Sequence, residues 1–199
     1  MLRKNAEQGS EQRYFIYFYS PADVRDMTFM VWKHPPRDAE RWLFLPALNM
    51  VRRIAANDKR SSFVGSDFTY EDISGRDLGA DAYKLLREEA MAGRDCYVVE
   101  SNPKAASAFS RKVSWIDKTS FLPVKEEYYD VQNDLSRVFT ADEVKEIKAH
   151  PTAVRRTMKN LKTGHYTEVV FENVDYDAGL EEGLFSERSL QTPPAKWIQ

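Results

Sequence analysis

Residues 13–19 read RYFIYFY, and this stretch together with residues 26–33, DMTFMVWK, decides the fold. In the first stretch, large apolar side chains occupy both sets of alternating positions, which is typical of a strand covered on both faces or of one that faces a lipid-like cavity. Aromatic residues favour strands because their flat rings pack well on a pleated surface. Pro21 and Asp23, between the two stretches, are typical of a turn. The sequence therefore predicts two strands at the start of the domain.

Similar short stretches recur along the chain at intervals of about ten residues, with breakers between them. The tetrapeptide Lys162–His165 (KTGH) predicts a hairpin turn. The polar stretch Asn57–Gly79 interrupts the series; within it, Asp67–Ile73 is expected to form one or two helical turns, with Gly65 at a special backbone angle and Asp67 as the helix cap. The further expected strands are Arg41–Leu45, Met50–Ile54, Ala82–Glu89, Arg94–Ser101, Arg111–Asp117, Val124–Val131, Arg155–Leu161 and Tyr166–Val174.

The segment around residues 140–150 admits two interpretations. Thr140 and Glu143 have the spacing of a helix capping box, and Val144 and Ile147 follow at helical spacing. The strands expected on both sides favour an extended conformation instead. Helix and strand both stay open here, whereas Leu180–Leu184 is expected to be a short helix.

Many short strands separated by turns predict an antiparallel sandwich or barrel rather than a doubly wound fold. The chain has 199 residues, which suits a single domain. We expect one β domain over residues 12–190, with loose termini at 1–11 and 191–199.

Composition excludes several classes of protein. The net charge is −2, so the chain lacks the strongly basic surface of a nucleic-acid binder. No stretch approaches the ~18 consecutive apolar residues of a membrane-spanning helix. The single cysteine, Cys96, cannot form an internal disulfide. Met1–Lys4 ends in two basic residues, but the following residues are polar, so the chain as written shows no export signal.

Residue patterns for catalysis or cofactor binding are weak. The three histidines, His34, His150 and His165, lack chelating spacing, and the apolar neighbours of Cys96 suggest a buried, unactivated thiol. Adjacent acidic residues such as Glu126 and Glu127 point to opposite faces of a strand and make poor acid–base pairs. The sequence therefore predicts a non-enzyme without metal or cofactor.

Two features fit ligand binding, and each has a plainer interpretation. Arg52 and Arg53 lie near further basic residues and could meet an anionic partner, or they could belong to a solvated charged loop. The strands rich in aromatic residues and methionine could form an ordinary core. They could also line a pocket for acyl chains, because pockets for apolar ligands are mostly apolar and methionine adapts to irregular shapes.

Several motifs resemble those of the bacterial outer-membrane lipoprotein-sorting protein family, which is related to the periplasmic lipoprotein carriers of the Lol system. They follow one another in order from about Ser20 to Leu190. The matching stretches are Trp42–Leu48, Val51–Ile54, Ser62–Asp72, Gly93–Tyr97, Ser114–Lys118 with Leu122-Pro123, Lys162–His165 and Leu184–Arg188.

The resemblance implies a half-open, strongly curved antiparallel β-barrel, with a few short helices as a lid over an apolar concave face. It also implies a periplasmic binding and transfer protein for acyl chains of lipoproteins or other lipids, without catalytic residues. An inner-membrane transporter is a further implied partner. The alternative is an accessory protein of an envelope transport or assembly machine, whose cavity is filled by its own side chains.

One alternating set of side chains is expected to line the ligand site, because period-2 alternation brings such a set to one face. Arg52 and Arg53 are expected at the rim, where they would attract a headgroup. The expected lining residues are Phe15, Tyr17, Met30, Trp32, Leu43, Leu45, Trp115 and Tyr128.

Overall fold

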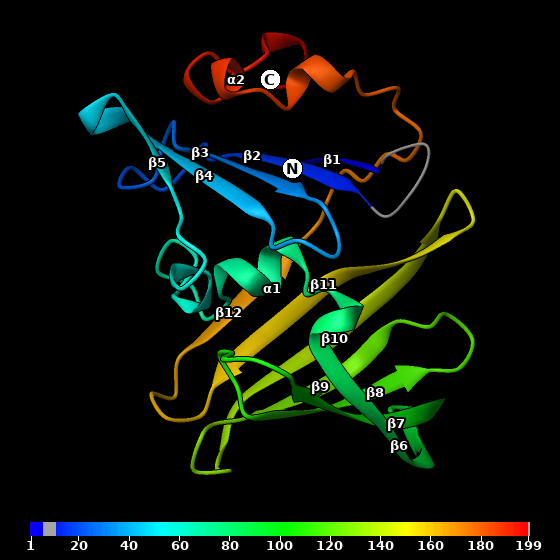
Figure 1. The fold of residues 1–199 in the computed structure, drawn as a ribbon. Coiled ribbons are helices and arrows are strands. Elements are labelled where there is room, and N and C mark those ends of the chain that lie inside the picture. The colour runs from blue at the N-terminus through cyan, green and yellow to red at the C-terminus, as the bar shows by residue number, and fades with distance from the viewer. Residues whose placement is uncertain (6–10, 199) are drawn as a thin grey trace. The chain divides into compact units, whose positions relative to one another are not determined.

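The computed structural model describes residues 1–5 and 11–198, and its strands form two open antiparallel sheets of five and seven strands. The chain divides into two compact units, which are described here one at a time (Figure 1). The first unit comprises Met1–Lys59, Tyr70–Gly75 and Asp177–Gln199, and the second comprises Arg60–Thr69 and Arg76–Tyr176.

The first unit is built on a five-stranded sheet whose strands follow chain order. Short connections suit this arrangement because antiparallel neighbours need only a tight turn between them. The β4–β5 connection is the 3₁₀ turn η1 (Pro46–Leu48), which ends where Asn49 adopts a φ of +46°. The strands are β1 (Leu2–Asn5), β2 (Gln12–Tyr17), β3 (Thr28–Lys33), β4 (Glu40–Leu45) and β5 (Met50–Arg53).

Short helical segments pack on the five-stranded sheet. Helix α1 (Tyr70–Ser74) contacts β3, since the rings of Phe29 and Tyr70 lie 5.5 Å apart. The C-terminal segment, orange to red in Figure 1, covers the sheet's other face. It carries η4 (Glu182–Leu184), α2 (Glu187–Gln191) and η5 (Ala195–Trp197).

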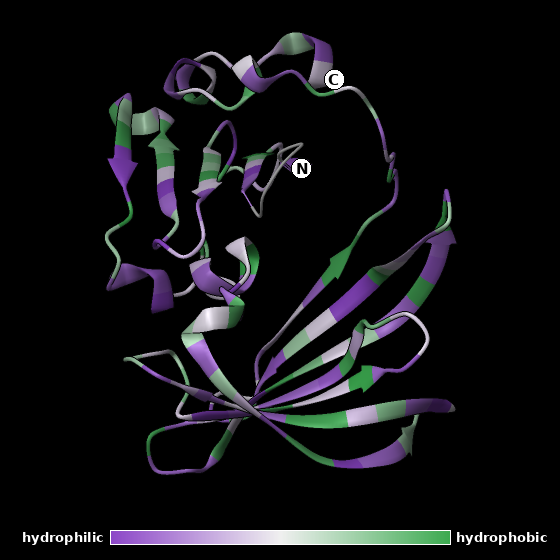
Figure 2. Cartoon of the chain, turned by 45° about the vertical axis from the view of Figure 1, so that its right-hand side comes forward, coloured by the Kyte–Doolittle hydropathy of each residue, from purple (hydrophilic) through white to green (hydrophobic). Residues whose placement is uncertain are grey.

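The second unit is a meander of seven strands in the order β6 to β12. Apolar and polar residues alternate along these strands, as expected for a sheet with two different faces (Figure 2). Two 3₁₀ turns, η2 (Asp58–Arg60) and η3 (Leu78–Ala80), lie in the connection from β5 to β6. The strands are β6 (Asp81–Met91), β7 (Arg94–Pro103), β8 (Arg111–Asp117), β9 (Pro123–Tyr129), β10 (Leu135–Ile147), β11 (His150–Asn160) and β12 (Tyr166–Val170).

The mainly β class is confirmed, but the strands form two open sheets and not one half-open barrel. The physical reason is the long polar connection of residues 54–80, after which β6 does not pair with β5. The ambiguous segment at 140–150 is extended up to Ile147, where β10 pairs with β11, and it turns at Lys148 and Ala149 into β11. The expected helical turns at Asp67–Ile73 appear slightly later, as α1.

The described parts of both termini belong to the first unit, whereas the sequence analysis expects loose termini. Leu2–Asn5 pairs with β2 as an edge strand, and Trp197 packs against the apolar core of the first unit. The remainder of the expected lead-in includes residues 6–10, which lie outside the described residues.

Candidate functional site

One face of the five-stranded sheet is almost entirely aromatic or aliphatic. Cross-strand pairing sets Phe15 opposite Met30, and Met30 opposite Trp42, so these three side chains share a face. Phe15 is 1% exposed and Met30 is fully buried. We call this surface the aromatic face. Its further members are Tyr17, Thr28, Trp32, Phe44 and Val51.

The chain's own C-terminal segment covers the aromatic face. We call residues 177–198 the C-terminal strap. Leu184, Phe185 and Leu190 of the strap belong to one buried cluster with Phe15, Met30, Trp42 and Phe44. The sheet therefore buries its apolar side chains against a segment that is mostly irregular in conformation.

Three side chains of the sheet hold the strap by its backbone carbonyl groups. Lys4 Nζ donates to the oxygen of Leu180 at 2.7 Å. Thr28 Oγ1 donates to the oxygen of Leu190 at 2.8 Å, in a buried bond. The indole of Trp32 donates to the oxygen of Phe185 at 3.0 Å. The strap is thus joined to the sheet by side-chain hydrogen bonds and apolar contacts, and not by a strand ladder.

An apolar hollow of about 30 Å³ lies at the end of the strap. It has room for about one water-sized group and no more. An acyl chain therefore cannot enter beside the strap unless the strap moves. The hollow is lined by Met1, Leu2, Phe15, Tyr17, Tyr19, Trp197 and Ile198.

Two of the expected lining residues, Leu43 and Leu45, lie on the other face of this sheet and not on the face of Met30 and Trp32, where the sequence analysis places them. Leu43 pairs with Phe29, whereas Met30 pairs with Trp42. Leu43 and Leu45 therefore point away from the aromatic face. The error arises because the alternation within a strand is visible in sequence, but the register between strands is not.

The expected pair Trp115 and Tyr128 lies in the seven-stranded sheet, on opposite faces. Trp115 pairs with Lys125, while Tyr128 pairs with Lys112, three residues away from Trp115 along β8. Each side chain also has a carboxylate partner. Trp115 lies in an apolar cluster around Val98 and its indole donates to Glu89, while the Tyr128 hydroxyl donates to Glu126 at 2.7 Å. These two side chains therefore do not share one surface of the seven-stranded sheet.

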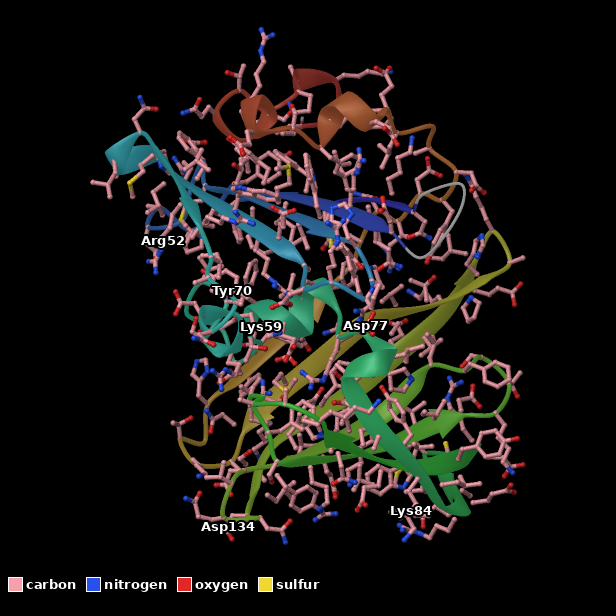
Figure 3. The ribbon with its side chains drawn as sticks, viewed as in Figure 1. Arg52, Lys59, Tyr70, Asp77, Lys84 and Asp134 are labelled. Atoms are coloured by element: carbon pink, nitrogen blue, oxygen red, sulfur yellow. The ribbon has the colours of Figure 1, made fainter. Side chains whose placement is uncertain are left out.

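The two expected rim residues also diverge, because they are neighbours on β5. Arg53 pairs with Trp42, and its guanidinium lies 5.9 Å from the centre of that ring. Arg52 pairs with Leu43 and points to the opposite face; Figure 3 labels it. Each has an acidic partner, Glu40 at 2.7 Å from Arg53 and Asp58 at 3.5 Å from Arg52. Only Arg53 borders the aromatic face.

Sequence reasoning missed the strap and the burial of Arg41. The strap's apolar residues are scattered among acidic ones, and only Ser186, which caps α2 by accepting from the Ser189 amide, is a recognisable local signal. Arg41 is 2% exposed and donates to Ser74 Oγ at 2.9 Å. Burial lowers the pKa of Arg41, and its position within a strand gives no hint of this partner.

The reactive side chains are held in ordinary structural roles. Cys96 is fully buried, and burial raises the pKa of its thiol, which makes the thiolate scarcer. His165 Nδ1 lies 2.6 Å from Asp67, and the ring of His150 stacks 4.4 Å from that of Tyr176. Within the described residues, no group of three potential ligands could hold a metal ion. Nor is any helix in this part of the chain long and apolar enough to cross a membrane.

Comparison with protein families and solved structures places the chain among its relatives. A family model described as "Uncharacterized protein" matches residues 10–192. A DUF1329 family protein from Desulfovibrio piger is 31% identical, with a TM-score of 0.85 over 93% of this chain and 79% of that one. No curated protein matches the chain.

Two further solved structures share the fold. A domain assigned to an outer membrane lipoprotein-sorting protein from Vibrio parahaemolyticus is 31% identical, with a TM-score of 0.89 over 95% of this chain and 82% of that one. A LolA superfamily protein from Nitrosomonas europaea is 18% identical, with a TM-score of 0.63 over 94% of this chain and 87% of that one. At that identity the last match concerns the fold alone.

Proposed function

Because the chain belongs to the family of this DUF1329 protein and this lipoprotein-sorting domain, we propose that it is a non-catalytic carrier of acyl chains that works in the periplasm. The ligand is an acyl chain of a lipoprotein or of another lipid. It binds on the aromatic face of the five-stranded sheet after the C-terminal strap has moved aside. An inner-membrane transporter is the partner that we propose for loading.

The observation that carries the proposal is the way the strap covers the aromatic face. Phe185 and Leu190 are the strap side chains buried deepest, at 1% and 0% exposure. An acyl chain could replace them, since each methylene that leaves water contributes about 0.8 kcal/mol. A chain of several methylenes therefore offsets the loss of the strap contacts without a charged anchor.

Arg53 marks the edge of the proposed site at which the headgroup of the ligand would lie. It borders the aromatic face beside Trp42, and its side chain is 66% exposed. A headgroup carrying a phosphate or carboxylate would lie at this edge, where the guanidinium can exchange its carboxylate partner Glu40 for the ligand. The exchange is inexpensive because an exposed ion pair contributes little stability.

The accessory role is the second candidate, and one observation favours it. Phe185 and Leu190 fill the aromatic face so completely that the adjoining hollow holds about 30 Å³. If the strap stays in place, the face is a core and the protein works through its outer surface.

Titration with a fluorescent fatty acid, 11-(dansylamino)undecanoic acid, separates the two candidates. We expect saturable binding that is displaced by unlabelled palmitate. Thr28→Val, which removes the hydroxyl bonded to Leu190, should bind the probe more tightly because the strap opens at lower cost. Thr157→Val is the matched control, since the Thr157 hydroxyl donates to Asp142 in the seven-stranded sheet. Absence of saturable binding by both the wild type and Thr28→Val rejects the carrier and favours the accessory role.

A further inference from the structure

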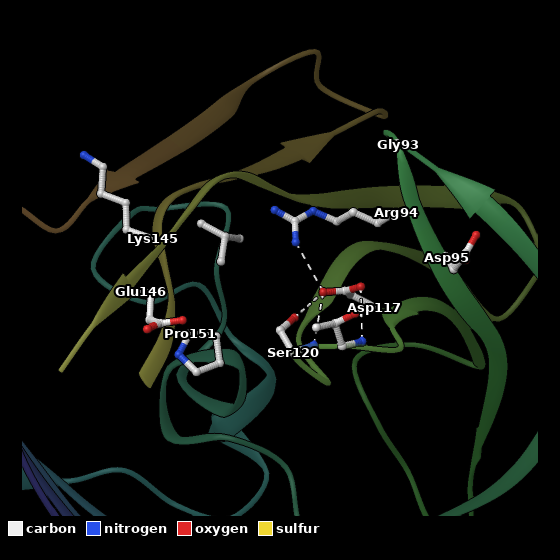
Figure 4. A pocket seen from close by; sticks show the side chains of 10 residues that line it. Gly93, Arg94, Asp95, Asp117, Ser120, Lys145, Glu146 and Pro151 are labelled. Atoms are coloured by element: carbon white, nitrogen blue, oxygen red, sulfur yellow. Dashed lines mark hydrogen bonds and ion pairs between the residues drawn. The ribbon is translucent and has the colours of Figure 1, made fainter. Parts of the chain in front are cut away.

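A hollow of about 530 Å³ lies at one end of the seven-stranded sheet, where three hairpins end (Figure 4). The β6–β7 hairpin contributes Arg94 and Asp95, and the β10–β11 hairpin contributes Lys145, Glu146 and Pro151. The β8–β9 turn supplies the floor through Asp117, Thr119 and Ser120. The hollow belongs to the second unit alone and takes no part in the acyl site proposed above.

The β8–β9 turn is held rigidly by one buried carboxylate. The side chain of Asp117 is 5% exposed and accepts from Ser120 Oγ at 2.6 Å, from the Ser120 amide at 3.2 Å and from Arg94 Nη1 at 3.2 Å. The amide of Phe121 donates to the backbone oxygen of Asp117 at 2.9 Å. These bonds fix the direction in which the next residue, Phe121, leaves the turn.

Phe121 is presented to solvent at the tip of this turn. Its side chain is 70% exposed, and its φ of +56° lies in the left-handed region, which a bulky residue rarely adopts. An exposed aromatic ring on a rigid support loses little conformational entropy when a partner covers it. Rings of this kind are typical anchors of protein–protein interfaces.

Two of the carboxylates that line the hollow lack an ion-pair partner among the described residues. Arg94 contacts Asp117, and Lys145 contacts Glu143 at 3.0 Å. Lys118 lies close enough to Asp95 to interact electrostatically, but its ammonium group donates a hydrogen bond to Glu88 at 2.5 Å. Within the described part of the chain, the carboxylates of Asp95 and Glu146 have no hydrogen-bond or ion-pair partner. The hollow therefore presents negative charge that an incoming cation could neutralise.

We propose that this end of the seven-stranded sheet is a docking site for a partner protein, which covers Phe121 with apolar side chains and places an arginine or lysine in the hollow. Charge complementarity favours a basic segment, because the three cations nearby already have carboxylate partners. An anionic lipid surface is disfavoured for the same reason, since Asp95 and Glu146 would repel it. The partner class is thus a polypeptide with basic residues flanked by apolar ones.

Two short peptides test the proposal on the full-length protein. They are acetyl-Ser-Leu-Arg-Leu-Arg-Ser-amide and its charge-reversed form, in which glutamate replaces arginine. Titrations followed by amide NMR should give saturable shifts at Asp95, Thr119 and Ser120 with the basic peptide alone. Phe121→Ala should weaken its binding about tenfold or more, as for an interface anchor. Asp95→Asn combined with Glu146→Gln should weaken it and reduce its dependence on salt.

Matched controls guard against general effects of the substitutions. Val131→Ala removes another exposed apolar side chain, 81% exposed in the β9–β10 turn, and should leave peptide binding unchanged. Thermal melting should be unaltered in every variant, because all the replaced side chains are exposed or partly exposed. Equal binding of both peptides, unchanged binding to Phe121→Ala, or no saturable binding up to about 1 mM overturns the proposal.

Discussion

The five-stranded and seven-stranded sheets bury their residues by different means. In β3, the consecutive residues Phe29, Met30 and Val31 are all fully buried, so both faces of that strand are covered by apolar groups. The seven-stranded sheet has a smaller apolar cluster around Val98 and Trp115. Further apolar side chains of this sheet are buried on β10 and β11, among them Phe139 and Met158. Its strands also carry cross-strand ion pairs such as Lys112–Glu126, at 2.6 Å.

The two sheets are therefore stabilised by different sets of contacts. The first sheet depends on a cover, the strap, which is remote in sequence and contributes apolar side chains. The second buries apolar side chains of strands that are neighbours in sequence and has tightly hydrogen-bonded turns, while its exposed ion pairs contribute little each. A ligand that replaces the cover would act on the first sheet, and a partner that recognises surface charge would act on the second.

The largest expected effect tests whether the strap is a true part of the core. Phe185→Ala should lower the free energy of unfolding by about 3–5 kcal/mol, because the ring is 1% exposed and its loss leaves a cavity. Urea unfolding followed by tryptophan fluorescence measures the change. Phe121→Ala is the same substitution on the second sheet at 70% exposure, and should change stability by no more than about 0.5 kcal/mol. Equal effects of the two substitutions would break the comparison.

The next effect tests whether turn hydrogen bonds stabilise the second sheet. Asp117→Asn should cost about 1.5–3 kcal/mol at neutral pH, since hydrogen bonds to a charged acceptor are lost. The bond from Ser120 chiefly, with the amides of Thr119 and Ser120 and the charge of Arg94, lowers the pKa of Asp117. This contribution is therefore complete above the ordinary aspartate pKa of about 4 and is lost as the pH falls through the lowered pKa. Urea unfolding of the wild type and Asp117→Asn at several pH values measures the difference in their free energies of unfolding. This difference should become smaller below about pH 4; a difference independent of pH would contradict this account.

Two matched tryptophan substitutions, one in each sheet, test in which sheet a loss of stability also changes the affinity for the fatty acid. Trp32→Phe removes the bond to the strap oxygen of Phe185, and Trp115→Phe removes a bond to Glu89. Each should cost about 0.5–1.5 kcal/mol. Only Trp32→Phe should raise the affinity for the dansylated fatty acid, because it alone loosens the strap. If Trp115→Phe raises the affinity equally, the acyl site has been assigned to the wrong sheet.

The strands could be predicted because their alternation is local, but pairing also overrode a local signal. Thr140 and Glu143 have the spacing of a capping box, yet Thr140 lies in β10 and its hydroxyl donates to Asp142 at 2.7 Å. Asp142 also accepts from Thr157 on β11. The ladder to β9 ends at Thr140, and from there to Ile147 the ladder to β11 stabilises the extended form more than one helix cap could stabilise a helix.

The candidate site could be predicted only in part, because faces are set by register. Phe15, Tyr17, Met30 and Trp32 fall on one face as expected, since adjacent hairpin strands keep them together. The position of Leu43 depends on which residue of β4 lies opposite Met30, and nothing within β4 states this. The strap is harder still, because its contacts join residues more than 150 positions apart, such as Thr28 and Leu190.

The polar loop before α1 was predicted half correctly. Gly65 has the expected unusual backbone angle, with a φ of +79°. Asp67 does not cap the helix, which begins at Tyr70. Its carboxylate instead accepts from Thr167 at 2.8 Å and lies beside His165, so it fastens the loop to β12. The angle follows from glycine's own freedom, whereas the partner of an aspartate depends on the tertiary fold.

A matched pair of glycine substitutions sharpens the comparison by separating backbone strain from packing. A Cβ added at Gly65 meets nothing within 4 Å, so Gly65→Ala tests the φ of +79° alone. We expect a loss of about 1–2 kcal/mol, the cost of the left-handed region for a residue with a side chain. Gly183, in the strap, has equally open surroundings and no positive φ. Gly183→Ala should therefore be neutral or stabilising by about 0.4–1 kcal/mol, since alanine restricts the unfolded chain. Urea unfolding of the two variants gives the measurement. A loss at Gly183 that matched the loss at Gly65 would mean that the strap, too, depends on a special backbone angle and does not adapt freely to the face it covers.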